Sequence, residues 1–441
     1  MKLSRAVTAA VCGLAAAALT AGCSSNGSSN GSSGAAASAN ANANQKVNLT
    51  FWSWVPNMDK IVAAWNKEHP DIQVTFTKAA GGDAELTKLL TSGKAHTMPD
   101  IAQVEYQSLP TLVSNNYLAD ISKYSGGLQS DYPAGLWSQV TLGTGALYGV
   151  PQDAAPLAFF YRTDLFKQYG LTVPTTWAEY QAEAQKLHAA NPKAYMGDTA
   201  TTDGGLFSGL TQQAGAKWWT ASGSSWSVGI DSAASQKVAS YWGGLVKSGA
   251  VDNKAAWTAD WSKALDNGTY ASWIAAVWAP GTLASEAADT SGKWAMAELP
   301  QWTAGEHVTG NWGGSATSVT SDSTHPQQAA AFIAWMNHES EGTDLLVTQG
   351  SVYPASLTAE SSSSLAVPTF IAGQSDFYTQ AKAYSQAAAA ATWGPDVNVA
   401  YSAFGDAFGA AATNKSDFLA ALSTVQQKVV ADMKSNGFTV S

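Results

Sequence analysis

Cysteine is almost missing from this chain. Among 441 residues there are only two, Cys12 and Cys23, so the sequence after residue 23 offers no pair for a disulfide. The six histidines are scattered without the spacing of a metal site. We therefore expect no disulfide, no metal site and no cofactor in the folded part of the protein.

Charge is also scarce, and positive charge most of all. Charged residues make up 13% of the chain and the formal net charge is −10. Without Lys2 and Arg5, which lie in the first segment, the net charge is about −12. An acidic chain with no basic run is a poor partner for nucleic acid or for anionic lipid headgroups. We therefore expect the protein to bind neither of them.

No apolar run reaches the about 18 residues that a membrane-spanning helix needs. The run at 6–20 is shorter and follows Lys2 and Arg5, which is typical of a secretory signal. We therefore predict a signal segment over residues 1–22 and export of the protein.

The end of that segment, LTAGC at 19–23, resembles the site cleaved in bacterial lipoproteins, although Thr20 replaces the usual aliphatic residue. The match predicts a lipid on Cys23 that anchors the chain at the extracellular face of the cell membrane. An ordinary secretory site with an incidental cysteine is the alternative. Residues 23–46 are rich in Ser, Gly, Ala and Asn, which predicts a low-complexity tether with a reach of roughly 26 Å.

Catalytic motifs are absent as well. The sequence has no G-x-S-x-G, no H-E-x-x-H and no P-loop, and GTGALYG at 143–149 misses the dinucleotide-binding spacing by one residue. We expect a protein that is not an enzyme. A glycoside hydrolase stays open as an alternative, because the distance between two carboxylates is a property of the folded chain.

What the chain does contain is an alternation of strands and helices. The β-branched and aromatic stretch 47–54 predicts a strand, and Asn57 is placed to cap a helix whose apolar positions follow a 3.6-residue period. The stretch 72–76 alternates as a second strand, so this region predicts a βαβ unit with a parallel sheet. Because such a sheet is covered on both faces, we expect Trp52 to belong to the core. Helices dominate the later thirds, with amphipathic stretches at 176–187, 232–247, 325–339 and 417–434 and short strands between them. The whole predicts an α/β protein with two lobes.

Two residues stand where a predicted strand ends, which is where open α/β sheets bind ligands. Trp54 follows the first strand, and Glu105 ends the buried strand DIAQVE. Asp153 lies between two prolines on an extended segment that we interpret as a crossover between lobes. We expect all three to contact a ligand. Core packing for Trp54 and an exposed loop charge for Glu105 are the alternatives.

Tryptophan is unusually frequent in this chain, with 18 residues. Trp278 precedes a Pro-Gly turn and Trp312 stands among glycines, so both are predicted as ligand contacts. Tyr353 and Trp393 are weaker candidates. The remaining positions on helical faces predict packing: Trp65, Trp177, Trp242 and Trp335.

Flat aromatic faces beside a few carboxylates suit a sugar, which has an apolar C–H face and a rim of hydroxyl groups. The sequence therefore favours a carbohydrate ligand, and the number of rings suggests an oligosaccharide. A receptor for another solute, such as a polyamine or a phosphodiester, would need more charge and fewer rings. It remains the second alternative.

The chain also resembles a known family, the family 1 extracellular solute-binding proteins, which include the lipid-anchored sugar receptors of bacterial ABC importers. The most specific segment is 148–180, which contains FFYRTDLF and VPTTWAEY. Supporting segments are LTFWSW, DIAQVEY, GNWGGSA, FIAWMNHESEG and GSVYPAS. Together they cover about residues 47–440, and they are specific to the family but not to one sugar.

The resemblance implies a two-lobed fold with three crossovers that closes on its ligand. Lobe one is then 47–152 plus 313–355, lobe two is 156–308 plus 370–441, and the crossovers are near 153–155, 309–312 and 356–369. It also implies a monomer that delivers solute to permease subunits and their ATPase. Family ligand positions fall on a set that adds two glycines to the candidates above: Trp54, Glu105, Asp153, Trp278, Trp312, Gly313 and Gly314. AVWAPGT departs from the usual Gly-Pro-Trp order, which leaves the orientation of Trp278 open.

Overall fold

The computed structural model describes residues 46–199, 201–222, 225–371 and 373–441. The predicted signal segment, nearly all of the tether and the lipidation site at Cys23 lie outside the described residues. In the part that is described, no helix combines the length and the apolar character that crossing a bilayer requires.

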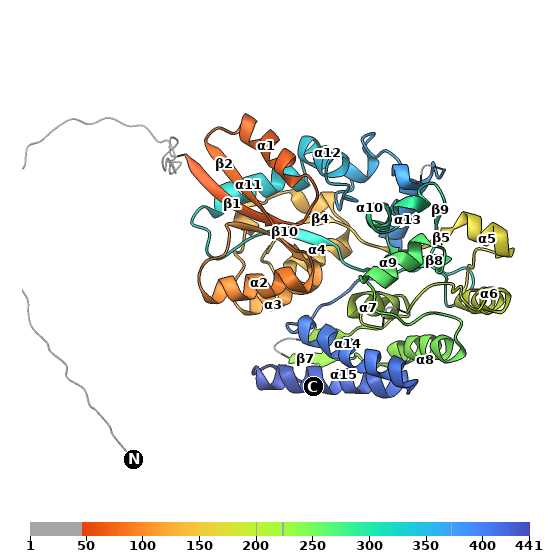
Figure 1. The fold of residues 1–441 in the computed structure, drawn as a ribbon. Coiled ribbons are helices and arrows are strands. Elements are labelled where there is room, and N and C mark those ends of the chain that lie inside the picture. The colour runs from red at the N-terminus through yellow and green to blue at the C-terminus, as the bar shows by residue number, and fades with distance from the viewer. Residues whose placement is uncertain (1–45, 200, 223–224, 372) are drawn as a thin grey trace, which may run out of the picture. The chain divides into compact units, whose positions relative to one another are not determined.

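The first sheet contains the predicted βαβ unit. Its five strands have the order β2-β1-β3-β10-β4 (Figure 1). β1, β2 and β3 run parallel, whereas β10 lies antiparallel between β3 and β4, so the sheet is mixed. Its strands are β1 (Val47–Ser53), β2 (Ile72–Lys78), β3 (Ile101–Glu105), β4 (Val150–Asp153) and β10 (Ser315–Val319).

Helices cover both faces of this sheet. Because βαβ crossovers are right-handed, the step from β1 to β2 and the return past β1 to β3 place α1 and α2 on opposite faces (Figure 1). α11 lies on the same face as α1. The helices are α1 (Met58–Glu68), α2 (Asp83–Lys94), α3 (Leu109–Ser114), α4 (Ala134–Thr141), α11 (Pro326–Asn337) and α12 (Ser340–Thr348).

Two local expectations for the first unit need correction. Asn57 stands at the N-cap position of α1, but its backbone is left-handed with φ 53° and its side chain does not cap the helix. Its Nδ2 instead donates to the carbonyl oxygen of Gln349 at 2.9 Å. Trp52, which a parallel sheet would bury on both faces, is only half-buried, and the Lys88 ammonium lies 3.5 Å from its ring centre.

Two smaller sheets follow. The first has the order β8-β5-β9 and is antiparallel throughout, and the second has the order β11-β7-β6. Their strands are β5 (Leu157–Arg162), β8 (Ser272–Ala276), β9 (Trp294–Ala297), β6 (Trp219–Ser222), β7 (Ser225–Val228) and β11 (Thr439–Val440).

Helices make up most of this second region. The predicted helices near 176–187, 232–247 and 417–434 are confirmed as α6, α8 and α15, and Thr176 with Glu179 forms a capping box at α6. α14 and α15 pack side by side, α14 against α7 and α15 against α8 (Figure 1). The helices are α5 (Thr163–Tyr169), α6 (Trp177–Ala190), α7 (Gly204–Gln213), α8 (Ala233–Ser248), α9 (Ala259–Asp266), α10 (Ala279–Glu286), α13 (Phe377–Ala387), α14 (Val397–Asn414) and α15 (Phe418–Ser435). Short 3₁₀ turns lie at Tyr106–Ser108, Ser122–Tyr124, Leu128–Asp131, Ala288–Thr290, Ala359–Ser361 and Thr369–Ile371.

The glycines of α7 are required by close packing. A Cβ on Gly209 would lie 2.5 Å from the carbonyl oxygen of Asn311, and a Cβ on Gly204 would lie 2.8 Å from the ring of Tyr401. Glycine costs about 1 kcal/mol relative to alanine inside a helix. The contact with the 310–311 segment and with α14 explains why α7 keeps glycine in spite of that cost.

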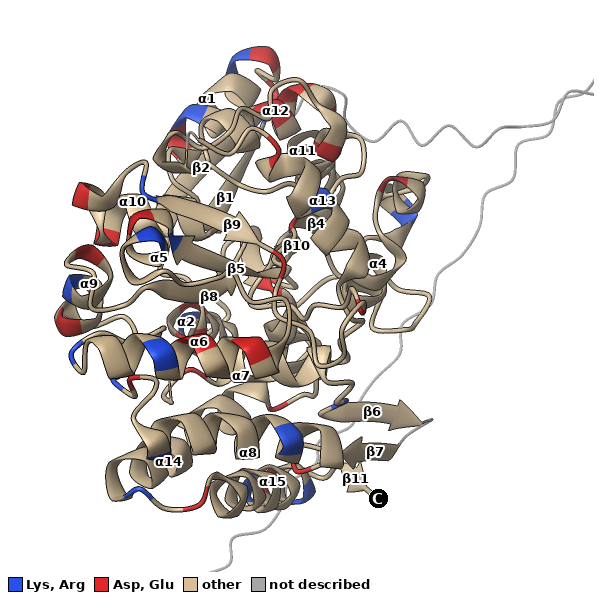
Figure 2. Cartoon of the chain, turned by 90° about the vertical axis from the view of Figure 1, so that its right-hand side faces the viewer, with Lys and Arg blue, Asp and Glu red and all other residues tan. Residues whose placement is uncertain are grey.

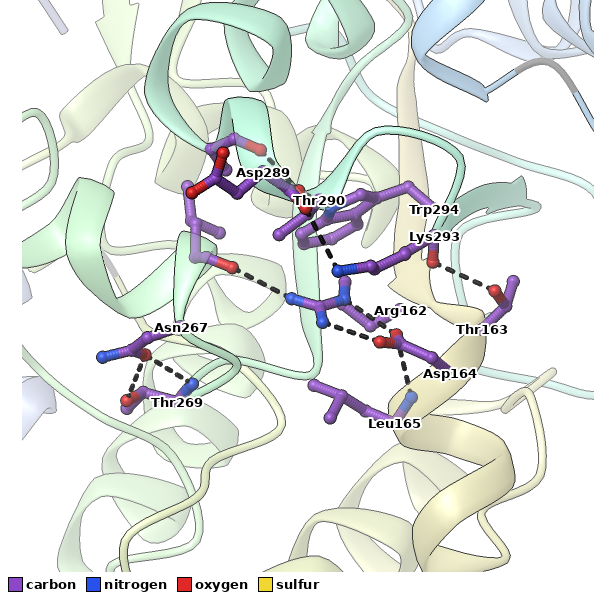
Figure 3. Close-up of polar contacts among 12 residues, drawn as sticks. Arg162, Thr163, Asp164, Leu165, Asn267, Thr269, Asp289, Thr290, Lys293 and Trp294 are labelled. Carbon is purple, nitrogen blue, oxygen red and sulfur yellow. Dashed lines mark hydrogen bonds and ion pairs between the residues drawn. The ribbon is translucent and has the colours of Figure 1, made fainter.

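The family-specific segment YRTDLF forms the junction between β5 and α5 (Figure 3). The buried Arg162 guanidinium makes two parallel hydrogen bonds to Asp164, Nε to Oδ1 and Nη2 to Oδ2, both at 2.8 Å. Its Nη1 donates to the carbonyl oxygen of Leu265 at 3.3 Å. These hydrogen bonds hold the pKa of Asp164 below its usual value. The motif thus stabilises a corner of the scaffold.

Three extended segments run side by side between the first sheet and the antiparallel one. The amide of Leu157 donates to Gly310 at 2.8 Å, and the amide of Trp312 donates to Ala155 at 3.0 Å. The amide of Ala154 donates to Tyr353 at 3.1 Å. Segments near 153–157, 310–312 and 353 therefore form one hydrogen-bonded strip.

Most indoles on helical faces are core, as predicted. Trp65, Trp177, Trp242 and Trp335 are all at most 4% exposed. Charged side chains are sparse on the ribbon and lie mainly on the outer turns of helices such as α5, α6 and α9 (Figure 2). The few carboxylates that lie inside the molecule are therefore a distinctive feature.

Candidate functional site

Two of the predicted carboxylates meet at one edge of the first sheet. Strand β10 pairs with both β3 and β4, and its first residue, Ser315, lies opposite Glu105 on one side and opposite Asp153 on the other. This register brings the ends of β3 and β4 to the same row. Open α/β sheets bind ligands beyond such strand ends.

Asp153 is held by the residue that it faces. Its Oδ1 accepts a hydrogen bond from the amide of Ser315 at 2.8 Å and a second, short one from the Ser315 hydroxyl. Burial nevertheless raises the pKa of Asp153 to about 6, since these hydrogen bonds only partly offset the loss of water. Asp153 is thus a fixed acceptor rather than a free surface charge.

Glu105 has the more perturbed carboxyl group. Burial raises its pKa to about 8, and the negative charges of Asp83, Asp153 and Asp203 raise it further. Its Oε2 accepts a hydrogen bond from Nε2 of Gln107 at 2.6 Å. A carboxyl group with this pKa is largely protonated at neutral pH, so that it can donate as well as accept a hydrogen bond.

Two polar residues that the sequence analysis missed lie beside this group. Asp203 caps α7, accepting from the amide of Leu206 at 2.9 Å, and burial raises its pKa. The hydroxyl of Tyr401 on α14 lies 3.3 Å from that of Ser208. Burial raises the pKa of Tyr401, and the charges of Glu105 and Asp203 act in the same direction. α7 and α14 therefore bring polar groups to the carboxylates of the first sheet.

Tryptophans gather next to these carboxylates. The rings of Trp278 and Trp312 lie 5.0 Å apart at 60°, and the indole N–H of Trp278 donates to the carbonyl oxygen of Trp312 at 3.1 Å. This hydrogen bond fixes the orientation of Trp278 that the sequence left open. The full cluster consists of five residues: Trp257, Trp261, Trp273, Trp278 and Trp312.

Trp257 differs from the other members of this cluster. Its side chain is 53% exposed, whereas Trp312 is 8% exposed and Trp261 is fully buried. Its backbone is left-handed with φ 63°, which is strained for a bulky residue. The indole N–H donates to Oδ2 of Asp203 at 3.2 Å. A large apolar ring is thus held in the open beside the carboxylates.

The predicted glycines lie between the two groups of residues. Gly313 and Gly314 have φ of 82° and 85°, a conformation that side chains with a Cβ rarely adopt. A Cβ on Gly313 would lie 3.8 Å from Nε1 of Trp278 and 4.0 Å from Oε1 of Glu105. The bare backbone at this position therefore separates an indole from a carboxyl group.

Trp54 stands at the rim of the same region. It is half-buried, and its ring covers the backbone of Gly81, where a Cβ would lie 3.4 Å from the ring. The next residue, Gly82, would place a Cβ 3.9 Å from Oε2 of Glu105. Trp54 and Glu105 are thus linked through one short loop.

The two weaker candidates lie in other surroundings. Tyr353 is buried, and its hydroxyl donates to Oε1 of Glu360 at 3.0 Å. Its carbonyl oxygen accepts from the amide of Ala154, so Tyr353 belongs to the hydrogen-bonded strip. Trp393 is buried and its indole N–H donates to Oε1 of Gln139 on α4 at 2.8 Å. Among the described residues, no group of three metal-ligating side chains lies together.

Known proteins give this geometry a context. The family model described as bacterial extracellular solute-binding protein matches residues 52–341. A lactose-binding protein of Rhizobium radiobacter is 29% identical over 304 residues, which cover 65% of this chain and 69% of the relative. An arabinooligosaccharide-binding protein of Bacillus subtilis is 25% identical over 68% of this chain and 71% of its own.

Solved structures agree with the fold. The galacto-N-biose/lacto-N-biose I-binding protein of an ABC transporter from Bifidobacterium longum, solved with lacto-N-biose, is 30% identical with a TM-score of 0.81, covering 90% of this chain and 99% of its own. A binding protein associated with an ABC transporter of B. animalis subsp. lactis, solved with β-1,6-galactobiose, is 27% identical with a TM-score of 0.79, covering 90% of this chain and all of its own. The fold is the two-lobed α/β type of periplasmic binding proteins, as predicted. The chain belongs to the family of bacterial extracellular solute-binding proteins.

Proposed function

We propose that this protein captures a neutral oligosaccharide between two lobes and delivers it to the permease subunits of an ABC transporter. Lobe one is 47–152 plus 313–355 and lobe two is 156–308 plus 370–441, with crossovers near 153–155, 309–312 and 356–369. The protein acts as a monomer without catalytic activity. Its partners are the permease pair and the ATPase that drives it, and the lipid on Cys23 is its membrane anchor.

One observation carries the proposal: ring faces and hydrogen-bonding groups from both proposed lobes lie around the same carboxyl group. Trp54 and Glu105 come from lobe one. Asp203, Trp257 and Tyr401 come from lobe two, and the charge of Asp203 raises the pKa of Glu105. A ligand favours closure only through contacts that both lobes make together.

The size of these contacts fits a sugar of ordinary affinity. Each aromatic platform contributes roughly 0.5–1.5 kcal/mol beyond the area that it buries, and each hydrogen bond to a charged group contributes about 1.5–3 kcal/mol. Three platforms and the two carboxylates of Asp153 and Asp203 bracket the about 8 kcal/mol of a micromolar complex. Trp54, Trp257 and Trp278 are the platforms with exposed surface.

The electrostatics of the site favour a ligand without negative charge. The negative charges of Asp83, Asp153 and Asp203 already raise the pKa of Glu105, and an anionic ligand would add to that repulsion. The relatives named above bind lactose, arabino-oligosaccharides, lacto-N-biose and galactobiose. We therefore place the ligand among neutral di- and oligosaccharides. The same carboxylates favour one competing class, a polyamine.

The test is a thermal-shift screen of the full-length purified chain. The panel contains lactose, lacto-N-biose, β-1,6-galactobiose, arabino-oligosaccharides, spermidine and a phosphodiester. We expect a saturable rise in melting temperature with at least one neutral sugar and none with the phosphodiester. A rise with spermidine alone would assign the site to a cation. Release of reducing sugar from the oligosaccharides would show a hydrolase and refute the proposal.

A further inference from the structure

A cavity lies next to the carboxylate site, which is formed by Glu105, Asp153 and Asp203. It has a volume of about 510 Å³ and is lined by the start of α10, the end of α12, the segment 364–370 and the start of α13. Cavities that hold small ligands measure about 300–1,000 Å³. At about 30 Å³ per water, the space holds roughly seventeen waters, which is more than the number of non-hydrogen atoms in one hexosyl unit.

The lining of this cavity contains no charged side chain. None of its residues is Asp, Glu, Lys, Arg or His. The lining combines aromatic rings with hydroxyl groups instead, a combination that suits the apolar face and hydroxyl rim of a sugar. The aromatic residues are Trp278, Tyr353, Phe370, Phe377 and Tyr378, and the hydroxyl residues include Thr348, Ser351, Ser364 and Thr369.

Trp278 belongs to both sites. Its indole N–H points to the carbonyl oxygen of Trp312 on the side of Gly313 and Glu105, and the same side chain lines the neutral cavity. Tyr353, on the wall of that cavity, accepts a hydrogen bond from the amide of Ala154, next to Asp153. The two sites are thus neighbours across one indole and one crossover strand.

We propose that the neutral cavity is a further subsite that receives an additional, uncharged sugar unit of the bound oligosaccharide. This inference rests on the proposed function. The first rings bind among Trp54, Glu105 and Asp203, and the chain of sugars continues past Trp278 into the cavity. Because no cation lines the cavity, it selects a neutral hexosyl or pentosyl unit over a uronic or sialic acid.

Gly281 provides a substitution with its own control. It lies in the first turn of α10 on the wall of the cavity, and a Cβ placed on it meets no atom within 4 Å. Gly281→Ala therefore adds a methyl group in open space, while Gly281→Phe adds a ring that fills part of the cavity. A second variant from the opposite wall, Thr348→Phe with Thr348→Val as control, tests the same volume through another element.

The experiment compares ligands that differ by one unit. Dissociation constants for β-1,6-galactobiose and β-1,6-galactotriose are measured by calorimetry, or for the corresponding arabinose pair if the screen selects arabino-oligosaccharides. In the unchanged protein we expect the trisaccharide to bind at least tenfold more tightly. Both Phe variants should remove that advantage and change disaccharide affinity less than about twofold, and both controls should keep it.

The outcomes separate the two proposals. Equal affinity for both lengths in the unchanged protein, or equal losses for both lengths in the Phe variants, overturns the subsite while leaving sugar capture intact. Unchanged trisaccharide affinity in both Phe variants overturns it as well. If no neutral sugar in the panel binds, the proposed function fails, and the subsite fails with it. Unfolding curves of all four variants verify that each is folded.

Discussion

The raised pKa of Glu105 makes a measurable prediction about stability. Burial and three neighbouring carboxylates raise this pKa from 4.5 to about 8 in the folded protein. A carboxyl group whose pKa is raised on folding stabilises the folded state below its unfolded pKa, and this contribution is lost as pH rises through the folded value. The Glu105→Gln variant has no such group, so its stability relative to the unchanged protein should increase with pH.

The magnitude follows from the size of the shift. Each unit between the two pKa values corresponds to about 1.4 kcal/mol, so the full shift sets an upper limit of about 5 kcal/mol above pH 8. Coupling to Asp83, Asp153 and Asp203 spreads the titration over the group and lowers the share of one residue. We expect Glu105→Gln to have nearly the same stability as the unchanged protein at pH 5 and to exceed it by about 1–3 kcal/mol at pH 8.5.

Urea unfolding followed by tryptophan fluorescence at pH 5, 7 and 8.5 measures this difference without ligand. Glu68→Gln, at the exposed end of α1, is the matched control for the loss of one glutamate charge. A difference between Glu105→Gln and the unchanged protein that stays constant over this range would refute the reasoning. An equal pH dependence for Glu68→Gln would also refute it, because the effect would then come from the loss of any glutamate charge.

Four further predictions concern single residues. Trp54→Ala should weaken sugar binding by about three- to tenfold in calorimetry, while its melting temperature stays within a few degrees of that of the unchanged protein. A large drop in melting temperature would instead show that the indole belongs to the hydrophobic core. Asp164→Asn leaves the buried Arg162 without its anion, so the free energy of unfolding, measured in urea, should fall by about 1–2 kcal/mol at pH 7. This loss should shrink as pH falls through the lowered pKa of Asp164, and a pH-independent loss would contradict the ion pair. Gly209→Ala should lower the melting temperature clearly, because the added Cβ would lie only 2.5 Å from the carbonyl oxygen of Asn311. An unchanged melting temperature would refute this close contact. Cys23→Ala should move the protein from the membrane fraction to the medium, while retention in that fraction would exclude lipid on this cysteine.

The first part of the fold could be predicted because its signals are local. The β-branched and aromatic composition of 47–54, the alternation in 72–76 and the helical periodicity between them identify β1, β2 and α1 without reference to the rest of the chain. β10 could not be placed in the same way, since Ser315 pairs with Glu105 and Asp153 only after a long excursion of the chain. Its antiparallel insertion makes the sheet mixed rather than parallel.

Helix α7 was not predicted because its composition conceals it. α7 begins with two glycines and contains Gly209, a composition that favours a loop when it is considered without its neighbours. Its helical state depends on packing against Tyr401 and the 310–311 segment. Asp203 was missed with the helix that it caps, and Tyr401 with α14, although both lie beside the predicted Glu105.

The candidate site divides along similar lines. Glu105 was found because it ends a predicted strand, and Asp153 because two prolines mark an extended crossover; the structure adds that one serine lies between them. Trp312 was predicted from the glycines around it, yet only its contacts show that its ring is buried in a cluster of five. Trp257 gave no signal, since neither its strained backbone nor its exposure can be read from neighbouring residues. Whether each of these residues touches a sugar stays a prediction.

The pairing of Arg162 with Asp164 has a consequence for how relatives are compared. The segment that most clearly marks the family serves the corner between β5 and α5, and its partners there are scaffold groups. A descendant can therefore keep this segment intact while every group around its solute is replaced. Two chains that share this segment share an architecture, and the solute of each has to be inferred from residues outside it, such as those at the proposed contact positions 203, 257 and 281.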